Sequence, residues 1–238
     1  MYRRLLIVAF TLIGIGICIH FLSSTNFFFE SPYEVVVTPT PSHDVVPVSF
    51  SNPFSTKNEI AILKETYQND DIIAKIEIEN TDFSSVVLQA EDNEFYLDHD
   101  LNGKPDGMGS TFLDYRNVLT DQKLLIYGHN SRNVNTEFQI LEQYLDESFY
   151  PEHSILTLRS ENGYYRYQAF AVLIVKDEVE HMKLSFTEEE YQTHLNYLKE
   201  NSLYDTGASV STDDDILLLQ TCYYYPENSF IVVAFRKI

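Results

Sequence analysis

The sequence predicts a mostly β protein, built as a barrel or closed sheet with one inserted helix. Several short segments alternate between apolar and polar residues or consist of consecutive aliphatic residues, which is typical of β-strands. The chain has 17 tyrosines and 16 phenylalanines but no tryptophan, and aromatic residues favour strands. One stretch, beginning at Thr187, combines a capping box with apolar residues at helical spacing. Many strands with one inserted helix indicate a barrel or closed sheet.

Residues 1–22 are predicted to form a cytoplasmic stub and a transmembrane anchor. Residues 5–22 carry no charge over 18 positions and follow Arg3 and Arg4, and this length suffices to span a bilayer. A cleaved signal peptide is the alternative, but the residues after Phe21 offer no clean cleavage site. Since the two arginines stay inside, the rest of the chain would face outward. We therefore expect a single-pass protein of the cell membrane with an extracellular domain.

The exported part is expected to consist of a stalk, residues 23–57, and a folded domain, residues 58–238. The stalk is rich in proline, serine and threonine, and Pro-rich spacers are extended and semi-rigid. The domain would begin with a short helix from Asn58 to Tyr67, in which apolar residues recur on one side.

Expected strands follow along the domain. Residues 72–79 alternate between buried and exposed types, and residues 98–109 are a loop marked by Asn-Gly, Lys-Pro and Asp-Gly pairs. An Asn-Gly pair at Gly163 predicts a hairpin turn. The other expected strands are residues 86–88, 123–127, 154–158, 164–175, 216–219 and 230–235.

Cys222 is the first candidate catalytic residue. It follows the aliphatic run 216–219 at the rim of the expected sheet, just before a turn at Pro226. The other cysteine, Cys18, lies in the predicted anchor, so Cys222 would be alone in an extracellular domain, where cysteines are usually paired. A leftover cysteine indicates an intermolecular disulfide or a reactive thiol. A small buried apolar side chain is the alternative interpretation.

His129 is the candidate partner of the thiol. A thiol with a pKa near ~8.5 needs a basic or cationic neighbour to become a nucleophile. His129 leaves the end of the expected strand 123–127 through Gly128, as Cys222 leaves its own strand, although a core histidine satisfied by hydrogen bonds is the alternative. The other histidines are interpreted as side chains of the anchor, the stalk, loops or a solvated helix surface: His20, His43, His99, His153, His181 and His194.

Charge and motif spacing argue against other classes of protein. The chain has 36 acidic and 16 basic residues, which argues against nucleic acid as a partner because phosphate neutralisation needs lysine and arginine. The absence of Cys-x-x-Cys or His-x-x-x-His spacing argues against a metal site. No metal or other cofactor is expected, although the acidic loops could bind calcium weakly.

Four segments carry recognisable motifs in a fixed order. Residues 89–97 match Gln-x-x-Asp-Asn-x-x-Tyr-Leu, and residues 109–117 match Gly-x-x-Phe-Leu-Asp-x-Arg-Asn. Residues 126–130 carry the histidine and residues 219–222 the cysteine. From about Asn58 onward the chain thereby resembles the class B sortases, membrane-anchored cysteine transpeptidases of Gram-positive bacteria. The helix after Thr187 resembles the insertion that distinguishes this class.

The resemblance implies an eight-stranded β-barrel with an N-terminal helix, an inserted helix at about residues 187–201 and a two-step acyl transfer. Cys222 would attack the carbonyl after threonine in a C-terminal sorting signal of the Asn-Pro-x-Thr-x type. His129 would pair with the thiolate and shuttle the proton. An amine of a peptidoglycan precursor or a pilin would then release the thioacyl enzyme. By the same matching, the substrate groove would be lined by Asn93, Leu97, Tyr127, Gln220 and Thr221, although core packing is an alternative for Leu97 and Tyr127.

One position departs from the family pattern. The family carries an oxyanion-stabilising arginine just before the last apolar run, where this chain has Phe230. Loss of such a donor costs about 2.7–4 kcal/mol of transition-state stabilisation. Arg236 shares the face of Phe230 but lies roughly 20 Å further along an extended strand. Arg132, in the loop after His129, is the other candidate.

Three functions follow from the resemblance. The leading expectation is a membrane-tethered sortase that joins surface proteins bearing a sorting signal to the cell wall. A pilin-polymerising class B enzyme would differ in its acceptor amine. A catalytically impaired protein that binds sorting signals without turnover is the third, and Phe230 favours it.

Overall fold

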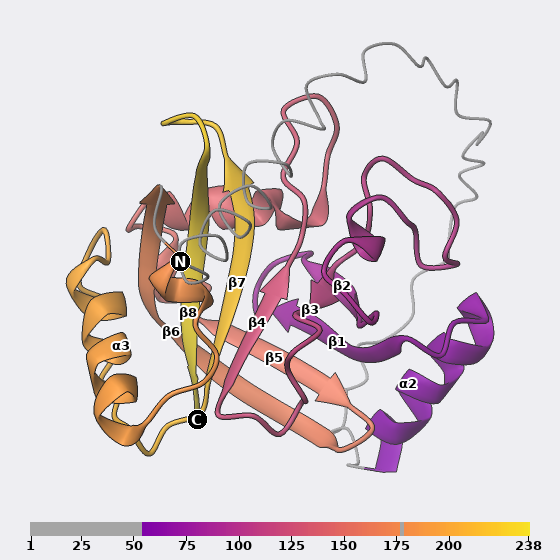
Figure 1. The fold of residues 1–238 in the computed structure, drawn as a ribbon, viewed down its shortest axis with the longest axis horizontal. Helices are drawn as coiled ribbons and strands as arrows, with labels where there is room; N and C mark the ends of the chain where they lie inside the picture. Colours follow the sequence, from indigo (N-terminus) through magenta and orange to yellow (C-terminus); the bar gives the residue numbers. More distant parts are fainter. Residues whose placement is uncertain (1–53, 177–178) are drawn as a thin grey trace, which may run out of the picture. The chain divides into compact units, whose positions relative to one another are not determined.

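Eight strands form a closed barrel, which the pairing of β1 with β5 completes. In the computed structural model, which describes residues 54–176 and 179–238, the order around the barrel is β1-β2-β3-β4-β7-β8-β6-β5 (Figure 1). The strands are β1 (Ile72–Ile78), β2 (Ser84–Leu88), β3 (Phe112–Leu113), β4 (Lys123–Tyr127), β5 (Ile155–Ser160), β6 (Gly163–Lys176), β7 (Ile216–Tyr223) and β8 (Ser229–Lys237). The expected eight-stranded, mostly β barrel is confirmed.

Within residues 54–176 and 179–238, two α-helices lie outside the barrel wall, on opposite sides of it in Figure 1. They are α2 (Phe54–Tyr67) and α3 (Glu188–Glu200). Thr187 caps α3 as expected: its hydroxyl accepts from the backbone N–H of Glu190, and the Glu190 carboxylate accepts from the N–H of Thr187. Short 3-10 helices lie in the connections: η1 (Phe95–Leu97), η2 (Glu137–Leu145), η3 (Tyr150–Glu152) and η4 (Glu180–Met182).

The sheet around β7 is buried on both faces, as the run of aliphatic residues predicts. Leu217 and Leu219 belong to the core inside the barrel. Leu218 belongs to a second cluster outside the wall, where it packs with Leu195 and Leu198 of α3. Because both faces are packed, the end of β7 is held by a rigid scaffold.

The N-terminal expectations fall largely outside the described residues. This applies to the anchor, residues 1–22, and to most of the stalk, residues 23–57. Helix α2 begins at Phe54 rather than at the expected Asn58. None of the helices in the described part of the chain has the length and apolar character needed to span a bilayer.

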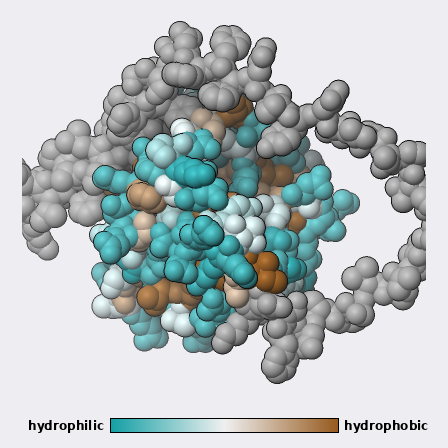
Figure 2. All heavy atoms as spheres, turned by 90° about the vertical axis from the view of Figure 1, so that its right-hand side faces the viewer, coloured by the Kyte–Doolittle hydropathy of each residue, from teal (hydrophilic) through white to brown (hydrophobic). Residues whose placement is uncertain are grey.

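The face of the domain shown in Figure 2 is mainly hydrophilic. Figure 2 shows the side that lies at the right in Figure 1, where hydrophilic side chains predominate and apolar ones form small groups. This agrees with a formal net charge of −20 for the chain.

Candidate active site

The parallel pair of β4 and β7 carries the histidine and the cysteine to the same edge of the barrel. Tyr127, the last residue of β4, is in register with Gln220 of β7. Since the two strands run in the same direction, the residues two positions further, His129 and Cys222, leave the pair together. As expected from the sequence, His129 and Cys222 come at the ends of buried strands. The structure adds that these two strands are direct neighbours.

Hydrogen bonds keep the two chains side by side beyond the last paired residues. The hydroxyl of Thr221 donates to the carbonyl of Gly128 at 2.7 Å. The Asn130 side-chain amide donates to the carbonyl of Cys222 at 3.2 Å, and the Tyr224 hydroxyl donates to the carbonyl of Asn130 at 2.8 Å. The segments around His129 and Cys222 are therefore tied together from both sides.

The ring of His129 is oriented by the loop that follows β2. Its Nε2 lies 2.8 Å from the carbonyl oxygen of Leu97 in η1. A carbonyl can only accept, so Nε2 carries the proton and Nδ1 is the basic nitrogen of the neutral ring. Burial lowers the pKa of His129, although the Leu97 carbonyl and the charges of Asp106 and Asp98 oppose this shift. The imidazole is thereby kept mainly neutral near pH 7, as a proton acceptor requires.

Cys222 is partly buried near the end of β7. Its partner across the β7–β8 hairpin is Phe230, so the two side chains lie on the same face of the sheet. The ring of Phe230 therefore lies beside Cys222, at the position where the family resemblance implies an arginine.

Arg236 does not reach this place. It lies opposite Ile216, at the other end of the β7–β8 pair from Cys222, and its guanidinium donates to the Gln168 side chain at 3.2 Å. The tentative assignment of Arg236 to the catalytic site is wrong, because the hairpin register that would have had to shift is continuous from Tyr223 to Ile216.

Arg132 lies beside the segment that follows the cysteine. Its guanidinium donates to the carbonyl of Tyr224 at 3.3 Å. The same group lies 4.3 Å from the ring centre of Tyr224 and 4.4 Å from that of Tyr225. Of the two arginine candidates, only Arg132 is held next to the strand end that carries Cys222.

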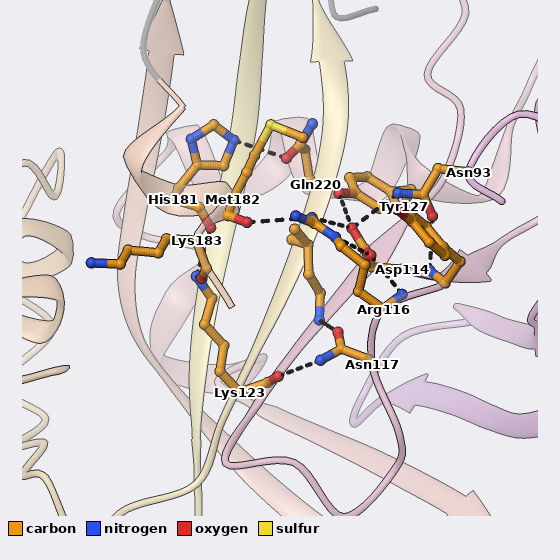
Figure 3. A network of polar contacts seen from close by, with 12 residues as sticks. Asn93, Asp114, Arg116, Asn117, Lys123, Tyr127, His181, Met182, Lys183 and Gln220 are labelled. Carbon is orange, nitrogen blue, oxygen red and sulfur yellow. Dashed lines mark hydrogen bonds and ion pairs between the residues drawn. The ribbon is translucent and has the colours of Figure 1, made fainter. Parts of the chain in front are cut away.

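Two of the expected groove residues, Asn93 and Tyr127, share a buried carboxylate (Figure 3). Tyr127 donates its hydroxyl to Asp114 at 2.8 Å, and Asn93 donates its amide to the same oxygen at 3.0 Å. Arg116 contacts Asp114 through two nitrogens, at 2.8 and 2.7 Å. Burial alone would raise the pKa of Asp114, but the hydrogen bonds from Arg116 and Tyr127 outweigh it and lower that pKa. Asp114 and Arg116 belong to the motif of residues 109–117, but the motif alone does not predict this ion pair.

Of the remaining groove residues, Gln220 and Thr221 lie on opposite faces of β7. Gln220 shares the face of Cys222, whereas the side chain of Thr221 points to the other face and is 2% exposed. The hydroxyl of Thr221 holds Gly128, so Thr221 shapes the site from behind instead of lining its open face. Leu97 packs in a small cluster beside Tyr127 and binds His129 through its backbone.

Two histidines differ from the sequence expectation. His181 and His194 were expected on solvated surfaces, but both are fully buried. They contact Lys123, whose side chain is also buried and whose Nζ lies 2.8 Å from His194 Nε2. This expectation was wrong because the contact with β4 that covers them joins residues far apart in the chain. No local pattern around Lys123 signals it. No group of three or more His, Cys, Asp or Glu side chains within residues 54–176 and 179–238 could hold a metal ion.

Comparisons with known proteins identify the family. A sequence model of the sortase domain matches residues 76–237. Sortase B of Staphylococcus aureus (strain NCTC 8325 / PS 47) is 32% identical over 174 residues, which cover 71% of this chain and 71% of that protein. The chain therefore belongs to the sortase family.

Solved structures lead to the same class. Clostridium perfringens sortase B superposes with a TM-score of 0.69 at 31% identity, covering 75% of this chain and 98% of that one. A Staphylococcus aureus sortase B–substrate complex gives a TM-score of 0.67 at 27% identity, covering 78% and 94%. The resemblance to class B sortases is confirmed, and these relatives support a cysteine transpeptidase of the sortase type.

Proposed function

We propose that the protein cleaves a C-terminal sorting signal of the Asn-Pro-x-Thr-x type after threonine and transfers the cleaved protein to an amine. The observation that carries this proposal is the parallel register of β4 and β7, which delivers His129 and Cys222 to one edge of the barrel. The similarity to a solved sortase B–substrate complex supports a peptide substrate.

The first step forms a thioester. The Cys222 thiol loses its proton to Nδ1 of His129, and the sulfur attacks the carbonyl carbon of the threonine. The C–N bond breaks, and the departing amine takes the proton from His129. The neutral ring fits this task because burial lowers the pKa of His129.

The second step releases the product. An acceptor amine attacks the thioester carbonyl and gives a proton to His129, the C–S bond breaks, and the sulfur recovers a proton. The acceptor is an amine of a peptidoglycan precursor, or of a pilin in a polymerising variant of the same reaction. Residues 1–22 would anchor the enzyme in the cell membrane with its domain outside.

Arg132 is the residue we assign to the developing oxyanion in place of the family arginine. It is the arginine candidate that lies by the cysteine segment, within hydrogen-bond distance of Tyr224. Asn93, Leu97, Tyr127 and Gln220 would contact the signal peptide, and Thr221 would hold the histidine segment.

The test is mass spectrometry of the full-length chain incubated with an Asn-Pro-x-Thr-x peptide, and with a scrambled peptide as control. The expected result is a covalent adduct with the proper peptide, absent in Cys222→Ala and strongly reduced in His129→Ala. A peptide that binds without any adduct would refute turnover. It would support the second candidate, a signal-binding protein without turnover, which the ring of Phe230 opposite Cys222 favours.

A further inference from the structure

Lys123 is a buried amine at the start of β4 that the proposed reaction does not use. Its side chain is 2% exposed, and its Nζ donates to the carbonyls of His181 and Lys183, both at 2.7 Å. The third neighbour is His194 Nε2 at 2.8 Å. An ammonium has three N–H donors, so these three acceptors match it. Lys123 thus fastens the η4 segment onto the barrel wall and onto α3.

His181 passes this attachment on to the groove. While its carbonyl is bound by Lys123, its ring Nε2 lies 2.8 Å from Oε1 of Gln220 (Figure 3). Because Oε1 only accepts, Nε2 is the protonated nitrogen. Burial, together with the charge of Lys123, lowers the pKa of His181 to about 4, so this ring stays neutral at physiological pH. Nε2 carries its proton in both the neutral and the cationic ring, so the donor to Gln220 persists near neutrality.

Burying the polar side chains of Lys123, His181 and His194 lowers the stability of the fold. Burial also lowers the pKa of Lys123 well below its ordinary value, with the charges of Glu180 and Asp114 opposing the shift and Arg116 adding to it. Nδ1 of His181 is buried without a hydrogen-bond partner, and Nδ1 of His194 has only the Glu180 carboxylate, 3.5 Å away. Well-packed apolar side chains would be no less stable here, and local costs of this kind are expected at functional sites.

Gln220, which is bonded to His181, lies where it can contact a peptide bound beside Cys222. It precedes Cys222 by two residues on the same face of β7, about 6.6 Å along the strand, which matches two residues of an extended peptide. Its Oε1 is occupied by His181, and in Figure 3 its amide nitrogen points away from that ring. The free direction of this carboxamide is therefore that of a donor, which fits a peptide carbonyl.

We infer that His181, held by Lys123, is a positioning residue that fixes the carboxamide of Gln220. In this orientation, Nε2 of Gln220 donates to a backbone carbonyl of the bound signal, about two residues before the scissile bond. This inference rests on the proposed function for the identity of the peptide. Contacts that run from Lys123 in β4 through His181 in η4 to Gln220 in β7 would thereby favour a peptide bound in an extended conformation.

The test is a double-mutant cycle on the full-length chain. His181→Leu removes the donor, His181→Gln keeps a donor near the position of Nε2, and Gln220→Met removes the carboxamide at similar length. His153→Leu is the matched control, because the ring of His153 contacts the carbonyl of Phe149 away from β7. Each variant is measured for KM and kcat with the signal peptide and, in the Cys222→Ala background, for the Kd of that peptide.

His181→Leu is expected to raise KM and Kd about tenfold, the value of one hydrogen bond, with kcat nearly unchanged. His181→Gln and His153→Leu should stay close to the unmodified chain. With Gln220→Met already present, His181→Leu should add little. An equal effect of His181→Leu in both backgrounds, or no effect, would overturn the inference. If no adduct forms but the Kd pattern appears, the proposed turnover fails while the positioning role stands.

Discussion

Phe230 lies opposite Cys222, at the position where the family resemblance implies an arginine, so the proposed reaction needs an oxyanion donor from elsewhere. Arg132 is held beside Tyr224, and Arg236 lies at the far end of the same hairpin. Arg132→Ala is therefore expected to lower the rate of thioacyl formation about 10²–10³-fold, whereas Arg236→Ala should leave it within about threefold. Rapid-quench mass spectrometry with the signal peptide measures both. Equal rates for the two variants would exclude Arg132 as the donor.

The contribution of the Asp114 carboxylate to stability can be measured separately with a single substitution. Asp114→Asn keeps the shape but weakens the bonds to Arg116, Tyr127 and Asn93, and we expect a loss of about 1–3 kcal/mol in the free energy of unfolding at pH 7. The loss stays modest because the Arg116 side chain is 37% exposed and solvent screens the pair.

The pH dependence of this loss has a definite sign. The folded-state pKa of Asp114 is lowered, so its stabilisation is present above the unfolded value of about 3.9 and disappears as the pH falls through the folded value. Thermal unfolding of the two proteins should therefore converge below about pH 4. Asp82→Asn, at an exposed carboxylate, is the control, and a constant difference down to low pH would contradict the assignment.

At the scale of elements, the sequence was informative where one element carries its own pattern. The alternation in β1 and the capping box at Thr187 are local, and both elements formed as expected. β3 has only two residues, Phe112 and Leu113, and two residues cannot display a period. The burial of His181 depends on a contact with Lys123 that spans 58 positions, so no window of sequence contains it.

Gly128 joins β4 to His129, and a substitution at this position tests how tightly the junction is packed. A Cβ added at Gly128 would collide with the ring of Phe138, which is fully buried in η2. Gly128→Ala should therefore cost about 1–3 kcal/mol in the free energy of unfolding and lower kcat, since the histidine segment must shift. Chemical denaturation and turnover measure the two effects. Gly107→Ala, where an added Cβ meets no atom within 4 Å, is the control, and identical behaviour of both variants would contradict this packing argument.

At the scale of the whole molecule, closure of the barrel joins distant parts of the chain. β1 pairs with β5 through contacts such as Ala74 with Ser160, and the site depends on the parallel pairing of β4 with β7. Hydrophobic periodicity predicts strands but not their partners, so the strand count and the parallel pairing that brings the ends of β4 and β7 together were reachable only through the family resemblance. The wrong proposal for Arg236 arose at this scale too, because it required a different register of β7 on β8.

The net charge of −20 gives the whole molecule a negative field that would act on a cationic acceptor of the proposed reaction. The charges of Asp98 and Asp106 act on His129, so the field is negative at the edge where the proposed acceptor amine would arrive. A cationic amine should be concentrated there, and salt should weaken this effect. Raising the ionic strength from about 0.01 M to about 1 M shortens the Debye length from about 30 Å to about 3 Å, so the KM for the amine should rise severalfold. Hydroxylamine, which is mainly uncharged at neutral pH, is the matched nucleophile and should show little change. If steady-state kinetics give the same salt dependence for both nucleophiles, the field does not steer the acceptor, and the acidic surface serves solubility alone.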